Sequence, residues 1–321
     1  MRLLAFIILS ILLLPCWWVG VWFFIVPLWR QRGKVSGTTY EPFTTRLLMH
    51  LIGTRHDPLT AKLAGHLPAC SPSTLRWLIL PQAWICKTSG FIPSPLRFPP
   101  PEHASMNCLI AARCEFLDRS LSSHLPHCKQ LVILGAGWDT RAYHADPSLA
   151  LFEVDAPATQ SVKRRSIKDS GIPHDHVHFV PCDFESQRWL DALTDHGFNP
   201  ELPTYVHWEG VTMYLERAAI ESTLEQFSQL PQGSILALDY LAENWLHHTT
   251  GGRLAKFMVA SFYGEPFRSG IPADTESLAK PFGLRILRHQ RLHAPGKPPY
   301  GGLLTLARRI EPAHKINMQS P

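Results

Sequence analysis

The sequence contains no Cys-x-x-Cys pair, and its cysteines number seven. A disulfide framework requires an even set of cysteines in a short secreted chain, and a structural zinc site requires ligands paired at short spacing. The basic excess is small, because 31 lysines and arginines face 26 acidic residues. Nucleic-acid-binding domains gather many basic residues on one face. We therefore expect reduced thiols in a reducing compartment, no metal site and no nucleic-acid partner.

Charged residues are also scarce, at 18% of the 321 residues, whereas apolar residues make up 45%. Disordered chains show the opposite balance, so the composition indicates a globular protein. Proline is frequent, with 28 residues, and proline ends or kinks helices. The secondary-structure elements are therefore expected to be short.

One long apolar segment, from Leu3 to Trp29, contains no charged residue. A helix of this length spans about 40 Å, more than the roughly 30 Å hydrocarbon core of a bilayer. The segment exceeds the apolar core of a signal peptide, so it predicts an uncleaved single transmembrane helix. The alternative is a hydrophobic hairpin that bends at Pro15 and lies in one leaflet. Basic residues follow at positions 30–34, and the positive-inside rule then places the catalytic part in the cytosol.

The remaining chain shows two different patterns of predicted secondary structure. Residues 36–128 read as helices broken by prolines, at positions 44–53, 59–67 and 104–124. Beyond residue 130, short apolar runs alternate with helical stretches, which is typical of buried parallel strands with crossover helices. The predicted strands are 131–134, 151–154, 177–180, 205–208, 235–238, 284–287 and 303–307. No helix is predicted between the last two strands, so we expect an open, seven-stranded α/β sheet with one antiparallel edge strand.

The first predicted strand runs directly into Gly135-Ala136-Gly137. Two glycines let the backbone approach a ligand closely, and the free N–H groups of a following helix would face that ligand. Asp139 or Thr140 would cap this helix. A dinucleotide fingerprint has a third Gly or Ala where this sequence has Thr140, which disfavours an NAD site.

Acidic residues end three further strands. Asp155 follows Gly135 by 20 residues, where an acid can bind ribose hydroxyls, the alternative being a helix cap. Asp183 and Phe184 form an acid–aromatic pair that could bind the amino group of an adenine and stack on its ring; the alternative is a loop acid. Glu209 ends the strand at the centre of the sheet, and a carboxylate there requires a cationic partner.

These motifs, in this order, resemble the leucine carboxyl methyltransferase family of class I S-adenosylmethionine-dependent O-methyltransferases. The resemblance covers roughly residues 40–310 and is carried by residues 52–58, 111–113, 134–143, 152–165 and 209–215. It implies a Rossmann-like methyltransferase sheet beneath an N-terminal helical lid, with S-adenosyl-L-methionine as the cofactor. The apolar N-terminal segment departs from the soluble pattern of the family.

The resemblance also implies roles for individual residues. Arg113 and Arg46 would hold the methionine carboxylate of the cofactor, and Arg46 replaces a lysine of the family. Glu209 would meet the cationic amino-acid end. Tyr214 would orient the methyl acceptor, although it could equally be a packed aromatic residue. The other implied cofactor contacts are Gly135, Gly137, Asp155, Asp183 and Phe184.

The acceptor is expected to be a carboxylate, on a small molecule or a protein C-terminus, or a hydroxyl. A carboxylate needs no general base, whereas a hydroxyl does, and His207 is a candidate for that role. For Arg113 the alternative is a helix ion pair with Glu115 or Asp118, and for residues 163–165 we expect a solvated basic face. A non-catalytic binding protein with this fold, and less so an NAD-dependent oxidoreductase, remain alternatives for the whole chain.

The expected division is a membrane anchor at 1–34, a helical lid at 35–128, a cofactor-binding domain at 129–310 and a tail at 311–321.

Overall fold

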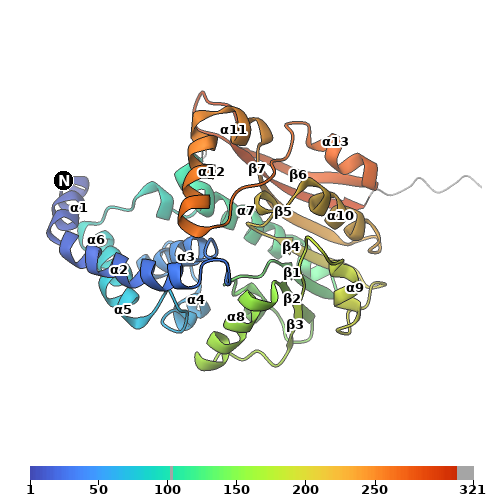
Figure 1. Cartoon of the computed structure of the whole chain (residues 1–321), viewed down its shortest axis with the longest axis horizontal. Coiled ribbons are helices and arrows are strands. Elements are labelled where there is room, and N and C mark those ends of the chain that lie inside the picture. Colours follow the sequence, from blue (N-terminus) through green and yellow to red (C-terminus); the bar gives the residue numbers. More distant parts are fainter. Residues whose placement is uncertain (102–103, 309–321) are drawn as a thin grey trace, which may run out of the picture.

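The structure, a computed structural model, describes residues 1–101 and 104–308. Its strands are β1 (Gln130–Leu134), β2 (Ala150–Asp155), β3 (Val177–Pro181), β4 (Thr204–Trp208), β5 (Ile235–Leu241), β6 (Leu284–Leu292) and β7 (Gly301–Arg308). They form one sheet in the order β3-β2-β1-β4-β5-β7-β6 (Figure 1). Neighbours among β1 to β5 pair in parallel. The predicted seven-stranded α/β sheet is therefore confirmed.

The antiparallel strand lies in a different place from the one predicted. β7 pairs antiparallel with both β5 and β6, so it lies inside the sheet while β6 forms the edge. Residues 293–300 connect the two strands without a helix, so β7 returns beside β6 and fills the space next to β5. The prediction of an antiparallel edge strand is wrong because sequence shows which strands form a hairpin but not which of them pairs inward.

Helices cover both faces of the sheet and its carboxyl edge. Before β1 the helices are α3 (Tyr40–Ile52), α4 (Pro58–Leu63), α5 (Pro72–Thr74), α6 (Leu80–Ser89) and α7 (Leu109–His124). The crossovers contain α8 (Pro157–Asp169), α9 (Trp189–Thr194) and α10 (Arg217–Ser228), and β5 leads into α11 (Glu243–His248), α12 (Thr250–Tyr263) and α13 (Thr275–Ala279). Short turns of π- or 3-10 helix span residues 75–79, 94–96, 106–108, 125–127, 141–144, 212–214 and 280–282. The predicted helices at 44–53, 59–67 and 104–124 correspond to α3, α4 and α7, with shifted ends.

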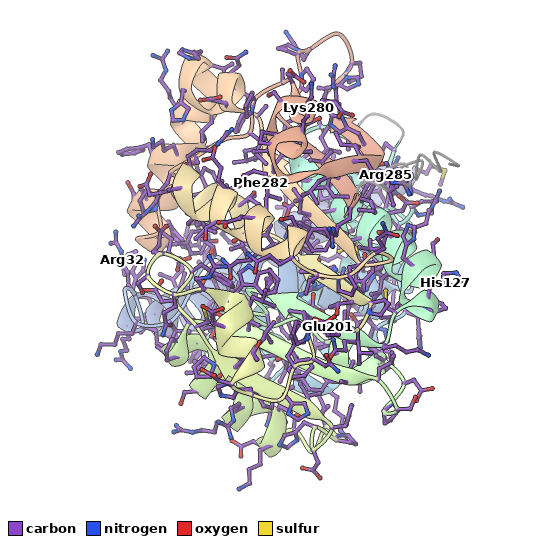
Figure 2. All side chains as sticks on the ribbon, turned by 90° about the vertical axis from the view of Figure 1, so that its right-hand side faces the viewer. Arg32, His127, Glu201, Lys280, Phe282 and Arg285 are labelled. Atoms are coloured by element: carbon purple, nitrogen blue, oxygen red, sulfur yellow. The ribbon has the colours of Figure 1, made fainter. Side chains whose placement is uncertain are left out.

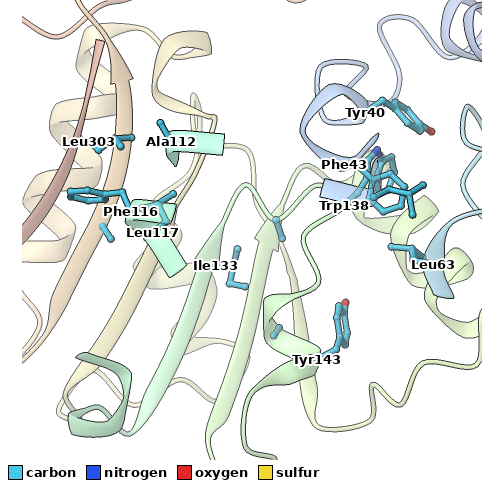
Figure 3. Packing of buried hydrophobic residues seen from close by; sticks show 14 of the residues in the cluster. Tyr40, Phe43, Leu63, Ala112, Phe116, Leu117, Ile133, Trp138, Tyr143 and Leu303 are labelled. Carbon is cyan, nitrogen blue, oxygen red and sulfur yellow. The ribbon is translucent and has the colours of Figure 1, made fainter. Parts of the chain in front are cut away.

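The core lies on both sides of the central strands. Because side chains alternate along a strand, Leu131 and Ile133 pack into one apolar cluster and Val132 and Leu134 into the other. Figure 3 shows the first cluster, where Ile133 faces α7 and Trp138 packs against side chains of α3. All seven cysteines are free thiols, and six of them are buried, as expected for reduced cysteines.

Residues 2–30 form two helices instead of the predicted single one. α1 (Arg2–Leu12) and α2 (Leu14–Arg30) are bent by 65° relative to each other. Among the described residues no single helix is long and apolar enough to cross a membrane, although the bent pair meets the same criterion as a unit. Pro15 lies in the first turn of α2, where it cannot donate to the preceding turn. The prediction of one continuous helix is therefore wrong, the structure does not support a single transmembrane helix, and the alternative of a bend near Pro15 is closer.

The predicted solvated face at residues 163–165 is wrong for Lys163. This side chain is buried, and its ammonium lies 2.8 Å from Oε1 of Glu153. Glu153 is buried too, and it accepts a hydrogen bond from the hydroxyl of Tyr143 at 3.0 Å. Burial raises the pKa of Glu153 to about 7, against the opposing effect of Lys163. This ion pair fastens α8 to β2.

Candidate cofactor and acceptor site

A cavity of about 700 Å³ opens at the carboxyl edge of the sheet, where open α/β sheets bind ligands. Residues from α3, α7 and α12 line it together with the loops that follow β1, β2, β3 and β4. The nine predicted site residues all line this cavity: Arg46, Arg113, Gly135, Gly137, Asp155, Asp183, Phe184, Glu209 and Tyr214. The structure thus brings them together, and the contact that each makes with a ligand stays a prediction.

The glycine turn after β1 leaves no room for side chains. Gly135 has a φ of +67°, and a Cβ there would lie 2.3 Å from Cγ2 of Val211. At Gly137, with a φ of +39°, a Cβ would lie 2.8 Å from Cγ2 of Thr39. The predicted helix after the turn is a single 3-10 turn at residues 141–144, so no row of helical N–H groups faces the cavity from there. Asp139 accepts from the backbone N–H of Arg141 and does not cap a helix.

Asp155 is held at the end of β2 by two backbone groups. Its Oδ2 accepts from the N–H of Gly137 at 2.6 Å and its Oδ1 from the N–H of Ala156 at 2.7 Å. The second contact resembles the alternative of a cap, since α8 begins one residue later, but the carboxylate also faces the cavity. Burial raises the pKa of Asp155. Asp183 lies in the loop after β3, where it accepts from Ser186 at 3.0 Å, next to the half-buried ring of Phe184.

Arg113 and Glu209 meet directly, although they lie 96 residues apart. Nε of Arg113 donates to Oε1 of Glu209 at 3.0 Å, and Nη1 donates to Oδ2 of Asp239 at 3.1 Å. The alternative of an ion pair within α7 is wrong, because Glu115 pairs with Arg119. Gly210 contributes to this arrangement, since its N–H donates to the other oxygen of Asp239 at 2.5 Å. Arg113 therefore joins α7 to the ends of β4 and β5.

Three further members of this network were not predicted to bind a ligand: Arg141, Asp239 and Asp139, which was expected only as a helix cap. Arg141 donates to Oε2 of Glu209 at 2.6 Å and also contacts Asp139. Arg46 reaches Oδ2 of Asp139 at 3.1 Å and lies 3.8 Å from Oε1 of Glu209. The sequence signal that could have identified Arg141 as a site residue is its position shortly after the glycine turn that ends β1. Asp239 had the weaker signal of an acid inside an otherwise apolar strand.

The network fixes the charge of its members. Burial tends to raise the pKa of Glu209, but Arg141 and Arg113 lower it more strongly, so its pKa lies well below the usual range. The carboxylates in turn hold the pKa of Arg141 well above its ordinary value, against the effect of burial. Glu209 is therefore an anion at every physiological pH.

His207 is completely buried on β4, and its Nε2 lies 3.2 Å from both Glu209 and Arg141. Asp139, His207 and Glu209 have ligand atoms close enough together to hold a metal ion. The two carboxylates are, however, already neutralised by guanidinium groups, and a cation there would face three arginines. The chemistry of this cluster thus favours an ion-pair network over a metal centre.

The other half of the cavity is apolar. Tyr214 lines it, with its ring centroid 5.4 Å from that of Phe267, and burial raises the pKa of its hydroxyl. The apolar lining comes from Met106, Leu109, Ile110, Leu241, Ala255, Val259 and Tyr263. Glu265 closes this side, because its carboxylate accepts from Ser36, Gly37 and Thr38 at 2.5–2.9 Å. The segment before α3 and the segment after α12 are thereby joined over the cavity.

Residues 95–228 match the sequence model of the leucine carboxyl methyltransferase family. The resemblance inferred from the motifs is therefore confirmed over this part of the chain, which contains every predicted site residue except Arg46.

Two relatives support the same class. The chain is 35% identical over 187 residues to "Putative S-adenosyl-L-methionine-dependent methyltransferase YktD" of Bacillus subtilis, which covers 56% of this chain and 61% of the relative. A similarly named protein of Mycolicibacterium smegmatis is 33% identical over 46% of this chain and 51% of its own length. The chain thus spans between half and two thirds of the length of these two relatives. A crystal structure of an S-adenosylmethionine-dependent methyltransferase from Clostridium acetobutylicum aligns with 62% of this chain and 92% of its own at 11% identity and a TM-score of 0.45.

Proposed function

We propose that this chain is an S-adenosyl-L-methionine-dependent methyltransferase that methylates a carboxylate oxygen of an apolar acceptor. The observation that carries the proposal is the composition of one cavity, which combines the glycine turn after β1, an acid at the end of β2 and a buried group of arginines and carboxylates beyond β4. The family match supports the same cofactor. In this proposal residues 35–128 form the lid of the site and residues 129–310 the cofactor-binding domain.

The residues present fit this cofactor. The glycine turn is a space that a Cβ would fill, and Asp155 presents a carboxylate where a ribose would lie. Within the described part of the chain, Nε of Arg46 and Nε1 of Trp138 are buried without a hydrogen-bond partner. Both side chains line the cavity, so a polar ligand would satisfy donors that are costly to leave unpaired.

Each residue then has a defined task. Asp155 binds the ribose hydroxyls, and Asp183 with Phe184 holds the adenine. Arg46 and Arg113 receive the carboxylate of the amino-acid end, and Glu209 receives its ammonium. When bound, the cofactor supplies a methyl group on a sulfonium, which is already electrophilic. The chain therefore needs mainly to hold the acceptor oxygen in line with that methyl group.

Two observations favour a carboxylate over a hydroxyl as the acceptor. A hydroxyl requires a base, but the candidate His207 is completely buried, with its Nε2 beside Arg141 and Glu209, so neither of its ring nitrogens is exposed to an acceptor. The hydroxyl of Tyr214 is protonated at neutral pH, and burial raises its pKa further, so it can donate a hydrogen bond to an acceptor carboxylate and orient it. The apolar lining around Tyr214 would bind the rest of the acceptor.

The test uses the full chain in mild detergent. Calorimetry should detect binding of S-adenosylmethionine and no measurable binding of NAD; a preference for NAD would refute the cofactor. Transfer of a tritiated methyl group to an extract should give a product that mild base hydrolyses, as expected for an ester. A base-stable product would refute the carboxylate, and cofactor binding without transfer to any extract would identify a non-catalytic binding protein.

A further inference from the structure

The helices α1 and α2 expose an unusually apolar surface. No residue of α1 is buried, and Leu12, Trp18 and Trp22 are each about two-thirds exposed. Soluble monomers rarely expose contiguous apolar patches of this kind without a binding role. We define the N-terminal apolar surface by its exposed side chains: Leu3, Leu4, Ile7, Ile8, Ile11, Leu12, Leu14, Trp17, Trp18, Val19, Trp22, Phe23, Trp29, Leu80 and Trp84.

The geometry of these helices suits a position along a membrane surface better than across it. With 11 and 17 residues, α1 and α2 are about 16 and 26 Å long, which is shorter than a hydrocarbon core of roughly 30 Å. One side of α2 is fixed to the protein, because a Cβ on Gly20 would lie 2.6 Å from the backbone of Leu78. One side of α1 likewise contacts the protein, at α6. The opposite sides remain free to contact lipid.

The side chains match the chemistry of a lipid–water interface. Four tryptophans, at positions 17, 18, 22 and 29, lie on this segment, and tryptophan concentrates at membrane interfaces. Arg30, Arg32 and Lys34 follow directly and are exposed, whereas residues 3–29 carry no charge. Anionic headgroups attract such basic residues. A protein partner would have no need for this sharp separation of apolar and basic residues.

The surface continues to the wall of the cavity. The ring centroids of Trp29 on α2 and Phe262 on α12 lie 6.4 Å apart, and Arg32 donates to the carbonyl of Ala260. α12 is apolar on two sides: the inner side lines the cavity through Ala255, Val259 and Tyr263, and the outer side exposes Leu254, Phe257 and Met258. Exposed apolar side chains therefore extend from α1 to the helix that borders the acceptor half of the site.

The opposite end of the molecule is different. Figure 2 shows it from the side that lies farthest from α1, and its labels include the exposed polar side chains of His127, Glu201, Lys280 and Arg285 and the partly buried Phe282. The extended apolar surface thus lies at the N-terminal end of the protein, away from this polar end.

We infer that the N-terminal apolar surface, with the outer side of α12, lies in one leaflet of an anionic phospholipid bilayer as an interfacial element. Resting on the proposed function, the apolar lining that α12 gives the cavity fits an amphiphilic carboxylic acid as the acceptor. The docking itself does not depend on the cofactor.

Vesicle flotation of the full chain tests the docking. Wild-type protein should float with vesicles of phosphatidylcholine and phosphatidylglycerol in equal parts, and less with phosphatidylcholine alone. The double variant Ile8→Asp/Trp18→Asp should lose about tenfold or more of this binding, since it places charges in the apolar region. The matched control Leu202→Asp changes an exposed leucine next to Glu201, at the polar end, and should float like wild type. Equal urea unfolding midpoints will show that the variants fold.

Three results would overturn the inference. One is wild-type protein that stays unbound in the presence of anionic vesicles, including the case in which two copies pair through this surface. Another is a double variant that floats as well as wild type, and the third is a quenching order that places the tryptophans deep in the bilayer. Quenching of tryptophan fluorescence by lipids brominated near the headgroup should exceed quenching by lipids brominated at the chain ends; the reverse order would indicate a spanning segment. Calorimetry with S-adenosylmethionine in detergent tests the proposed function separately.

Discussion

Replacing Arg113 with alanine tests the electrostatic design of the site. The guanidinium is 5% exposed and bonds to Glu209 at 3.0 Å and Asp239 at 3.1 Å, so its loss leaves two buried carboxylates with one fewer partner each. Removing one member of a buried ion pair typically costs about 3–5 kcal/mol of folding stability. Loss of a desolvated charge contact costs about 2–5 kcal/mol of binding, which is roughly a 30- to 5,000-fold loss of cofactor affinity.

The assay combines urea unfolding with calorimetry. Arg119→Ala is a matched control on the same helix, because Arg119 is 61% exposed in its side chain and exposed ion pairs contribute at most about 1 kcal/mol. Removing Arg113 and Glu209 together should cost less than the sum of the single losses, because the double variant leaves fewer unmatched charges. Wild-type affinity and stability in Arg113→Ala would refute the reasoning, as would strict additivity.

Two more substitutions follow from the structure. Gly135→Ala should abolish measurable cofactor binding and lower stability more than Gly283→Ala, since Gly283 has a similar φ of +63° but free space around it, whereas a Cβ on Gly135 meets Val211; equal losses in urea unfolding would contradict this. Lys163→Met should lower the free energy of unfolding by about 3–5 kcal/mol at pH 8 and by less at pH 5. The pKa of Glu153 is raised to about 7 in the folded protein, so at pH 5 the folded state binds a proton more readily than the unfolded state. The Glu153 carboxyl is then neutral, and the loss of its cationic partner costs less. A loss that does not change between these pH values would refute the role of Glu153.

Much of the fold followed from local sequence signals. The strands β1, β2, β4 and β5 are short apolar runs, and such runs between helical stretches are typical of parallel strands that helices cover on both faces. The parallel direction of the strands also made the place of the site predictable, because residues at the carboxyl ends of parallel strands gather at one edge of the sheet. For that reason Asp155, Asp183 and Glu209 could be placed near one another from the sequence.

The contacts within the site could not be predicted in the same way. Arg113 meets Asp239 only because α7 crosses the ends of β4 and β5, and sequence spacing carries no information about that crossing. Lys163 was assigned to solvent because it belongs to a run of three basic residues, whereas its position on α8 points it at Glu153. Hydrophobicity likewise predicted the length of the apolar segment, residues 3–29, but not that its helix is interrupted at Leu13.

The ion network at the end of β4 already pairs its buried charges. Arg46, Arg113 and Arg141 contact Asp139, Glu209 and Asp239, and Arg141 also contacts Asp118. A ligand end that carries both an ammonium and a carboxylate adds no net charge to this network. Long-range steering depends on net charge and is screened by salt beyond about 10 Å. We therefore expect this network to recognise the amino-acid end of the proposed cofactor through short-range exchange of partners, with an affinity that varies little with ionic strength, in contrast to pockets that bind phosphates through an excess of positive charge.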